Sequence, residues 1–474
     1  MVFDRIFQPF IEASPVSVMF RGTLENVLSA ERLDRLFADT AKRQYLHELT
    51  FSTCVELLGL VVTQIRPSVN AAYRARRERI GVSVQSLYQK LSGIEPAVSE
   101  ALVRDTAADL GAIIDRMDAA VSGPLRGFDV RIVDGNHLQG THHRLKELRR
   151  VGDAALPGHT LSVLNPQRQL IEKVIVCPDG HANQKPLFGR LLGEVEPGQC
   201  WIADRDFSTR TFLFGVADRE AYFVVRHHQV LPAEPVGRHR RVGKTDTGEV
   251  YEQKVRLADG LGREVLVRRI TVELTQPTRD KDLEIHVLSN LPAKVSGRKI
   301  ADAYLSRWRI EAAFYKLTMV LRCELNTLGY PDAALFGFCL AVVMYNALAT
   351  VMAALRVAHP EVAVQSDRRS ASKRTAGTPK FSFYYLADEI AGVWRGMALV
   401  IPASCWTKTF AHRTPAQMAK LLLWLARQGQ IDPFLTNPVR VKKRKKRRII
   451  QHGGHVSTYQ ILEQRQHSKN KRLQ

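Results

Sequence analysis

The hydrophobic and polar positions of this 474-residue chain change their period along its length. Residues 1 to about 120 follow the three-to-four-residue spacing of amphipathic helices, which predicts helices at 50–64, 83–91 and 99–117. Ser83 lies where an N-cap residue is expected, because a serine hydroxyl there accepts a hydrogen bond from the first helical turn. The basic segment 74–79 and Gly81 fit either a DNA-binding helix-turn-helix or a plain helical bundle.

From residue 128 the pattern changes to short apolar strands that alternate with helices. Strands are expected at 129–133, 159–164, 169–176, 201–204 and 222–225, with helices at 186–192 and 209–217. The sequence Asn165-Pro166-Gln167 marks a turn between the second and third strands. Three strands, a helix and then alternating strand and helix is the order of a ribonuclease-H-like sheet. We therefore predict an α/β fold with that mixed-sheet core.

Residues 226–282 interrupt this order with β-rich, basic segments. We interpret them as a β-strand insertion, after which the sheet resumes at 283–290 and a long helix runs from about 296 to 326. A last helix is expected near 415–428. The predicted domains are a helical N-terminal domain that binds DNA ends (1–124), an α/β domain with the insertion (125–360), and a helical and basic C-terminal region (361–474).

One uncharged run, residues 333–355, is long enough to cross a bilayer. It contains Gly337, Asn346 and many alanines, so its hydrophobicity is modest. A buried helix packed on the sheet explains this run better than a membrane span does. No membrane partner is expected.

The formal net charge of +22 and the pI near 9.9 indicate a polyanion as partner, and nucleic acid is the commonest. A solvated basic surface without a dedicated partner is the alternative, but the charge is clustered. Residues 366–380 are rich in Ser, Arg and Lys and are predicted to form a flexible loop. The basic run 440–448 is predicted to bind DNA phosphates without sequence preference, through Lys442, Lys443, Arg444, Lys445 and Lys446.

The six cysteines form no C-x-x-C pair, and most lie in apolar runs. They are predicted to be buried thiols in a reducing cytosol, so neither a disulfide framework nor a zinc site is expected. The sequence contains no P-loop, nucleophile-elbow or dinucleotide fingerprint, which leaves an NTP-driven enzyme or a serine hydrolase without support. We expect a cytoplasmic protein associated with the nucleoid.

Three acidic residues carry the candidate chemistry. Asp134 and Asp204 each end an apolar strand, and Glu311 lies on the long helix. Two carboxylates at strand ends and one on a later helix can hold two divalent metal ions, and such a pair can cut and rejoin a phosphodiester backbone. Magnesium is the expected metal, with two ions per site and Mn²⁺ able to substitute, because Mg²⁺ prefers hard oxygen ligands.

The helix around Glu311 carries the spacing Tyr304-x2-Arg307-x3-Glu311, which alone fits an ordinary solvated ion pair. Preceded by VLSNLP at 287–292, however, it resembles the DDE transposases of the family named after insertion sequence 4, whose helix carries a Y-x2-R-x3-E-x6-K signature. The sequences IVDG around Asp134 and IADRDF around Asp204 are similar to the two aspartate motifs of that family. The resemblance covers about residues 125–355.

One departure concerns the lysine of the signature, which would fall at Thr318. Lys316 is near in sequence but lies about 140° around the helix from Glu311. Arg322 lies about 20° from Glu311 on the same helical face. We therefore predict that Arg322 takes over the lysine's contact with DNA phosphate.

The resemblance implies cleavage at transposon ends and strand transfer into target DNA, with Asp134, Asp204 and Glu311 as catalytic residues and metal ligands. Asp206 stands where a glycine is common, but we favour Asp204 because it ends the strand. By the same resemblance, Tyr304 and Arg307 hold DNA phosphate near the cut, since the planar arginine fork binds phosphate bidentately. The implied partners are double-stranded DNA of transposon ends and target, and a second copy of the chain in a synaptic homodimer.

Two other functions remain open: a structure-specific nuclease on the same fold, and a DNA-binding regulator with an inactive site. A terminal inverted repeat beside the gene would favour the transposase over the nuclease. The presence of all three acidic residues argues against the regulator. Metal-dependent DNA nicking that is lost in Asp134→Ala would exclude it.

Overall fold

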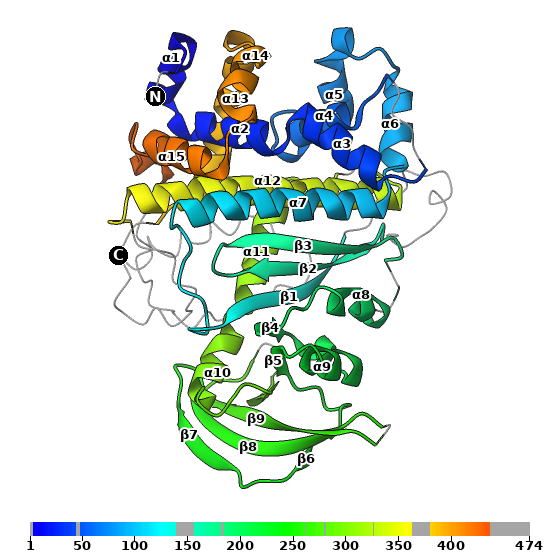
Figure 1. Cartoon of the computed structure of the whole chain (residues 1–474), viewed down its shortest axis with the longest axis vertical. Coiled ribbons are helices and arrows are strands. Elements are labelled where there is room, and N and C mark those ends of the chain that lie inside the picture. Colours follow the sequence, from blue (N-terminus) through cyan, green and yellow to red (C-terminus); the bar gives the residue numbers. More distant parts are fainter. Residues whose placement is uncertain are drawn as a thin grey trace, which may run out of the picture. The chain divides into compact units, whose positions relative to one another are not determined.

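In the computed structural model of this chain, the described residues are 3–43, 48–138, 156–180, 182, 184–260, 262–278, 281–325, 327–362 and 380–436. The chain up to Asn437 forms one compact unit (Figure 1). The predicted DNA-binding residues 442–446 and nearly all of the predicted loop 366–380 lie outside the described residues.

The N-terminal segment is helical, as predicted. Its α-helices are α1 (Gln8–Ala13), α2 (Pro15–Val27), α3 (Ala30–Thr40), α4 (Phe51–Val62), α5 (Val69–Arg74), α6 (Val84–Ser92) and α7 (Pro96–Arg116). The predicted N-cap is confirmed, because Ser83 Oγ accepts a hydrogen bond from the Ser86 amide at 3.1 Å. Pro96 occupies the first position of α7, where its missing amide hydrogen has no intrahelical partner to lose.

The strands join in one mixed sheet. They are β1 (Asp129–His137), β2 (His159–Asn165), β3 (Leu170–Cys177), β4 (Gln199–Ala203), β5 (Tyr222–Arg226), β6 (Glu234–Pro235), β7 (Arg240–Lys244), β8 (Gly248–Ala258), β9 (Glu264–Leu274) and β10 (Glu284–Ser289). Their order is β3-β2-β1-β4-β5-β10-β9-β8-β6, and β7 pairs with β8. The β1–β4 and β4–β5 pairings are parallel, and the others are antiparallel. The predicted α/β class, the succession of strands and helices along 129–225 and the β insertion are confirmed, and the insertion extends the same sheet beyond β10.

Both faces of the sheet centre are covered, which explains why β4 is buried at every position rather than at alternate ones. In β4, Cys200 and Ile202 belong to the core shared with α7, α11 (Trp308–Met319) and α12 (Pro331–Ala358). Trp201 and Ala203 belong to a second core with α8 (Phe188–Leu192) and α9 (Arg210–Ala217). Asp204 follows Ile202 by two positions, so its side chain leaves the strand toward the α11 face.

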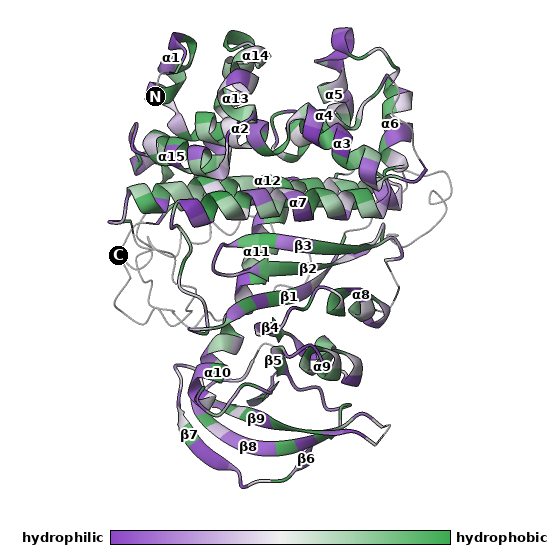
Figure 2. Cartoon of the chain, viewed as in Figure 1, coloured by the Kyte–Doolittle hydropathy of each residue, from purple (hydrophilic) through white to green (hydrophobic). Residues whose placement is uncertain are grey.

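Helix α12 is the long uncharged run that raised the question of a membrane span. It is long and apolar enough to cross a bilayer, but its most apolar window is entirely buried within the protein, and Figure 2 shows its ribbon as mostly hydrophobic. The prediction of a buried helix is confirmed. The polar residue Asn346 is tolerated in this buried helix because its side-chain amide makes two hydrogen bonds with the Ile171 backbone of β3, at 2.8 and 2.9 Å.

The prediction of one continuous helix over 296–326 is wrong. The chain forms α10 (Gly297–Leu305) and α11 (Trp308–Met319), separated at Ser306 and Arg307. The Ser306 and Arg307 amides bond to carbonyls three residues earlier, and Ser306 Oγ donates to the Ala303 carbonyl at 2.6 Å. This tighter turn reorients the chain between the two helices.

The helices that precede the sheet in the sequence and those that follow it belong to one hydrophobic core. Phe410 packs against Phe7, and Trp394 of α13 (Phe383–Val400) packs against Phe20. Helix α15 (Pro415–Ala426), predicted at 415–428, and the short α14 (Ala403–Trp406) complete this layer. The division into three domains stays a prediction.

Candidate active site

The register of two parallel strands brings the predicted aspartates together. Ile132 of β1 pairs with Ile202 of β4, and Asp134 and Asp204 each lie two residues further on. Neighbouring strands lie about 4.8 Å apart, and residues two positions apart share a face. The two carboxylates therefore lie side by side on the face that α11 covers. The prediction that Asp134 ends its strand holds only for the pairing with β4, because β1 continues along β2 to His137.

Arg307 connects this pair of strands to Glu311. Arg307 Nη1 donates to Asp134 Oδ2 at 3.0 Å, and Arg307 Nη2 lies 2.6 Å from Glu311 Oε1. The Arg307 and Asp134 side chains are 14% and 15% exposed, whereas Glu311 is 32% exposed. One buried guanidinium therefore contacts two of the three predicted acidic residues, and the helix break at Ser306 precedes it directly.

The electrostatics of the site are those of crowded carboxylates. Burial and the charge of Asp204 raise the pKa of Asp134 to about 7, although the Arg307 cation and the Gly135 amide act in the opposite direction. Burial, followed by the charge of Asp206, also raises the pKa of Asp204. The positive charge of Arg307 does not balance the carboxylates around it, so the site has room for more cationic charge.

Tyr304, near the end of α10, lies close to Arg307. Tyr304 is 8% exposed; burial raises the pKa of its hydroxyl, and the charge of the nearby Arg307 acts in the opposite direction. Arg307 also lies against the Trp308 ring, with 5.5 Å from its guanidinium carbon to the ring centroid. Among the described residues, Arg307 Nε is buried without a hydrogen-bond acceptor. The predicted contacts of Tyr304 and Arg307 with DNA stay predictions.

The donor set fits a divalent cation in part. Asp134 and Asp204 offer adjacent hard oxygen donors whose mutual repulsion a cation would relieve. Glu311 is held by Arg307. No group of three or more Asp, Glu, His or Cys side chains in the described part of the chain lies close enough to hold a metal ion. Bringing the third carboxylate in requires Arg307 to release Glu311.

The preference for Asp204 over Asp206 as a metal ligand stays a prediction, which burial and charge favour. Asp204 is partly buried, and its Oδ1 accepts a hydrogen bond from the Asp206 amide at 2.9 Å. Asp206 is exposed. The charge of Asp204 acts on the pKa of Asp134, so Asp204 lies near that carboxyl.

Arg322 does not lie on the helical face of Glu311, because α11 ends at Met319. Arg322 follows in an irregular segment, where its amide bonds to the Val62 carbonyl and its Nη1 donates to the Pro67 carbonyl at 2.8 Å. The angular argument for Arg322 is therefore wrong, while its contact with DNA stays a prediction. Lys316 points elsewhere, as predicted, with its Nζ over the Tyr345 and Phe383 rings.

Gln184 is a neighbour of the site that the sequence pattern did not single out. A Cβ added to Gly135 would lie 2.4 Å from Gln184 Nε2, so the glycine beside Asp134 leaves room for this amide. Gln184 lies in a connection between β3 and α8, where no motif or periodicity marks it. Only the folded chain places it beside the aspartate.

A family model and a solved structure resemble this chain. Residues 126–347 match the family model described as the transposase DDE domain, and this segment contains Asp134, Asp204 and Glu311. No curated protein matches the chain. Among solved structures, it is similar to piggyBac transposase in a cryo-EM structure of its synaptic complex with hairpin DNA, with 11% identity, a TM-score of 0.38, and coverage of 89% of this chain and 87% of that chain. The family match supports a DDE transposase.

Proposed function

We propose that this protein is a DNA transposase that cleaves at transposon ends and joins them to target DNA, with a ribonuclease-H-like core and the signature helix of the family named after insertion sequence 4. The observation that carries the proposal is the matched register of Asp134 and Asp204, with Glu311 joined to Asp134 through Arg307. Catalytic carboxylates placed from two strand ends and a later helix are suited to phosphodiester chemistry.

Asp134, Asp204 and Glu311 would hold two Mg²⁺ ions, and Mn²⁺ would substitute. When bound, the metals activate the attacking water or 3′-hydroxyl and stabilise the leaving oxygen. The protein's own residues set the geometry: the two strands fix the aspartates in register, and α11 presents Glu311 to them. Arg307, once released from Asp134 and Glu311, would offer five donor groups to a DNA phosphate, with Tyr304 beside it.

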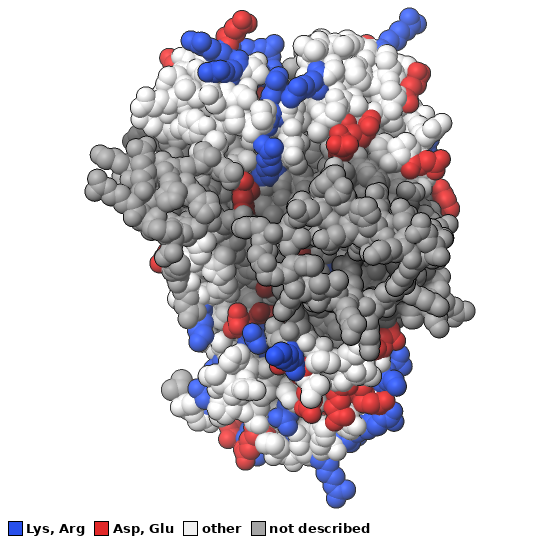
Figure 3. All heavy atoms as spheres, turned by 180° about the vertical axis from the view of Figure 1, so that it is seen from behind, with Lys and Arg blue, Asp and Glu red and all other residues white. Residues whose placement is uncertain are grey.

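Double-stranded DNA is the proposed partner, and the net charge of +22 supports it. On the face seen in Figure 3, Lys and Arg side chains gather over the helical end of the unit and over the β7–β9 extension, with acidic side chains among them. The basic residues 442–446 add charge that would contact phosphates. Coordinated cutting of two ends calls for a homodimer in a synaptic complex.

The test is metal-dependent nicking and joining of a DNA duplex that carries the element's own terminal repeat. Asp134→Asn, Asp204→Asn and Glu311→Gln are each expected to lower the rate at least about 100-fold, because even outer partners of metal ligands contribute 10–100-fold. Asp206→Asn is the matched control, since it removes a neighbouring exposed carboxylate and is expected to keep activity. Full nicking activity in Asp204→Asn would refute the proposed site. Nicking without any joined product would identify a nuclease instead.

A further inference from the structure

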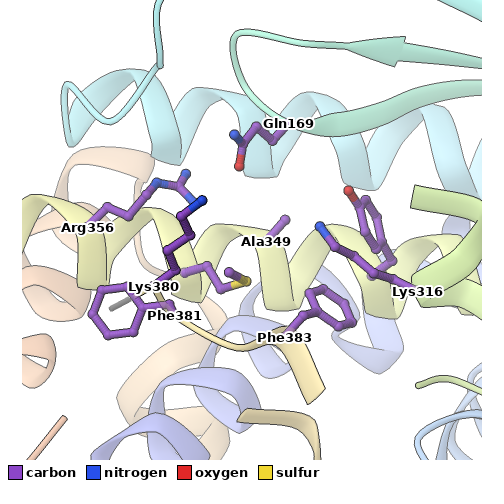
Figure 4. A pocket seen from close by; sticks show the side chains of 9 residues that line it. Gln169, Lys316, Ala349, Arg356, Lys380, Phe381 and Phe383 are labelled. Atoms are coloured by element: carbon purple, nitrogen blue, oxygen red, sulfur yellow. The ribbon is translucent and has the colours of Figure 1, made fainter. Parts of the chain in front are cut away.

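A small basic pocket lies between α11, α12 and the segment that leads into α13 (Figure 4). Its cavity volume is about 20 Å³. Three cationic side chains line it, from three separate parts of the chain: Lys316, Arg356 and Lys380. None of the described residues that line the pocket is acidic. Figure 4 shows the nitrogens of Arg356 and Lys380 pointing to the same region below Gln169, with Lys316 on the opposite side.

Arg356 is a largely buried cation of this pocket. Within the described part of the chain it makes no hydrogen bond or ion pair, and burial lowers its pKa to about 10 in spite of the nearby Tyr345 hydroxyl. Arg356 lies in the last turn of α12, where the helix dipole favours a cation. That dipole does not provide hydrogen-bond acceptors for the five donors of a guanidinium.

The aromatic residues of the pocket hold the remaining cation in place. Lys316 Nζ lies 5.8 Å from the Tyr345 ring centroid and 5.3 Å from that of Phe383, and these two rings are 5.4 Å apart. Such cation–π contacts fix the direction of the lysine. The positive charge that the pocket offers to a ligand therefore comes first from Arg356 and Lys380.

The size of the pocket limits what enters it. A volume of about 20 Å³ takes roughly one water-sized group. A single oxygen of a phosphate group fits, while the rest of the anion stays at the mouth, where flexible lysines reach it. A nucleobase or a whole small molecule is too large for the cavity.

We propose that this pocket binds a non-bridging oxygen of a DNA backbone phosphate. The inference rests on the proposed function, because the DNA would be the strand that passes the active site. Lys316 lies five residues after Glu311 on α11, which corresponds to about 7.5 Å along the helix axis and about 140° around it. A phosphate bound there would hold the strand on another side of α11, at a fixed distance from the catalytic carboxylates.

The experiment measures binding of the full chain to a random-sequence DNA duplex, without divalent metal, over a series of KCl concentrations. Arg356→Gln and Lys380→Gln are each expected to weaken binding and to reduce the slope of log K against log[KCl] by about 0.9, the value for one lost phosphate contact. Lys420→Gln is the matched control, since Lys420 is exposed on α15 and is expected to leave affinity and slope unchanged. A second arm measures how inorganic phosphate shifts the thermal unfolding midpoint of the wild type and of Arg356→Gln.

The outcomes are distinct. Slopes of Arg356→Gln and Lys380→Gln equal to those of the wild type and Lys420→Gln would overturn the inference. A phosphate-induced shift that needs Arg356, with an unchanged DNA slope, would show a site for free phosphate and overturn the DNA assignment. Wild-type protein that binds no DNA would overturn the proposed function itself. If the wild type binds DNA but the pocket variants have the same slope, only the inference about the pocket fails and the proposed function stands. Arg356→Gln is expected to fold, because it removes a buried charge that lacks a counter-charge.

Discussion

Arg307 and Asp134 are joined by a hydrogen bond of 3.0 Å, from Nη1 to Oδ2, although 173 positions separate them in the chain. The same guanidinium contacts Glu311. In the metal-free protein, Arg307 thus provides positive charge between two carboxylates that are proposed to hold metal. This relationship makes the arginine both a structural tie between β1 and α11 and a competitor for the proposed ions.

Removing that arginine tests both roles. Arg307→Ala is expected to lower the free energy of unfolding of the metal-free protein by about 3–5 kcal/mol, because it leaves buried carboxylates without their partner. Mg²⁺ is expected to recover part of the loss, and Mn²⁺ is expected to bind more tightly than to the wild type. Urea unfolding with and without metal, and calorimetric titration with Mn²⁺, provide the measurements. Arg307→Lys keeps the positive charge but cannot contact both carboxylates as the guanidinium does, so the free energy of unfolding should fall less than in Arg307→Ala. Unchanged stability and unchanged metal affinity in Arg307→Ala would contradict this role.

The raised pKa of Asp134 predicts a pH dependence with a defined sign. Its carboxyl ionises near pH 7 in the folded protein but near pH 4 in the unfolded chain. Between these values the folded state binds more protons, so the contribution to stability is full below about pH 4 and is lost as the pH rises through 7. Asp204, whose pKa is also raised, acts in the same direction.

Unfolding of the metal-free protein, followed from pH 4 to 8, is therefore expected to become easier as the pH rises, and less steeply so in Asp134→Asn. Metal binding has the opposite dependence, because the ion competes with the proton on the carboxylate. Mn²⁺ affinity is expected to increase as the pH passes 7. An Asp134→Asn variant with the wild-type pH dependence of stability would assign the effect to another group.

Much of the sheet and its aspartates was predictable because the relevant signals are local. Apolar strands bounded by turn residues located β1 to β5, and matched strand ends located Asp134 and Asp204. The break after Leu305 was not predictable, because neither Gly nor Pro marks it and the turn depends on a tertiary contact of Arg307. Because α11 ends at Met319, Arg322 is not helical and its angle relative to Glu311 cannot be calculated from helix geometry.

The pocket around Arg356 shows a second limit of local patterns. Its three cations come from 316, 356 and 380, and nothing in their spacing indicates that they meet. Asn346 is similar: in sequence it merely reduced the hydrophobicity of an apolar run. In the structure it satisfies backbone groups of a sheet strand. Such long-range pairings arise from packing rather than from periodicity.

That pairing of Asn346 predicts a large effect from one buried substitution. Asn346→Leu keeps the branched shape of the side chain but leaves the amide and carbonyl of Ile171 without partners inside the core. Each unsatisfied group costs about 1–3 kcal/mol, so a loss of roughly 3 kcal/mol or more in the free energy of unfolding is expected. Thr350→Val, on the same helix, is the control. The Thr350 hydroxyl bonds only to the Asn346 carbonyl, and its loss is expected to cost about 1 kcal/mol. Equal losses in the two variants by urea unfolding would contradict the role given to Asn346.

The basic run near the C-terminus predicts a salt dependence that differs in size from that of the pocket. Replacing Lys442, Lys443, Arg444, Lys445 and Lys446 with Gln is expected to reduce the slope of log K against log[KCl] for random-sequence DNA by up to about 4.5, or 0.9 for each lost phosphate contact. The control replaces the four lysines with arginine, which keeps the charge, and the slope should then remain that of the wild type. Fluorescence anisotropy from low to physiological salt measures both. Since electrostatic contacts to phosphate carry little sequence information, the Gln variant should lose affinity for random and end-specific duplexes alike. A loss confined to the end-specific duplex would assign the run to recognition rather than to general attraction.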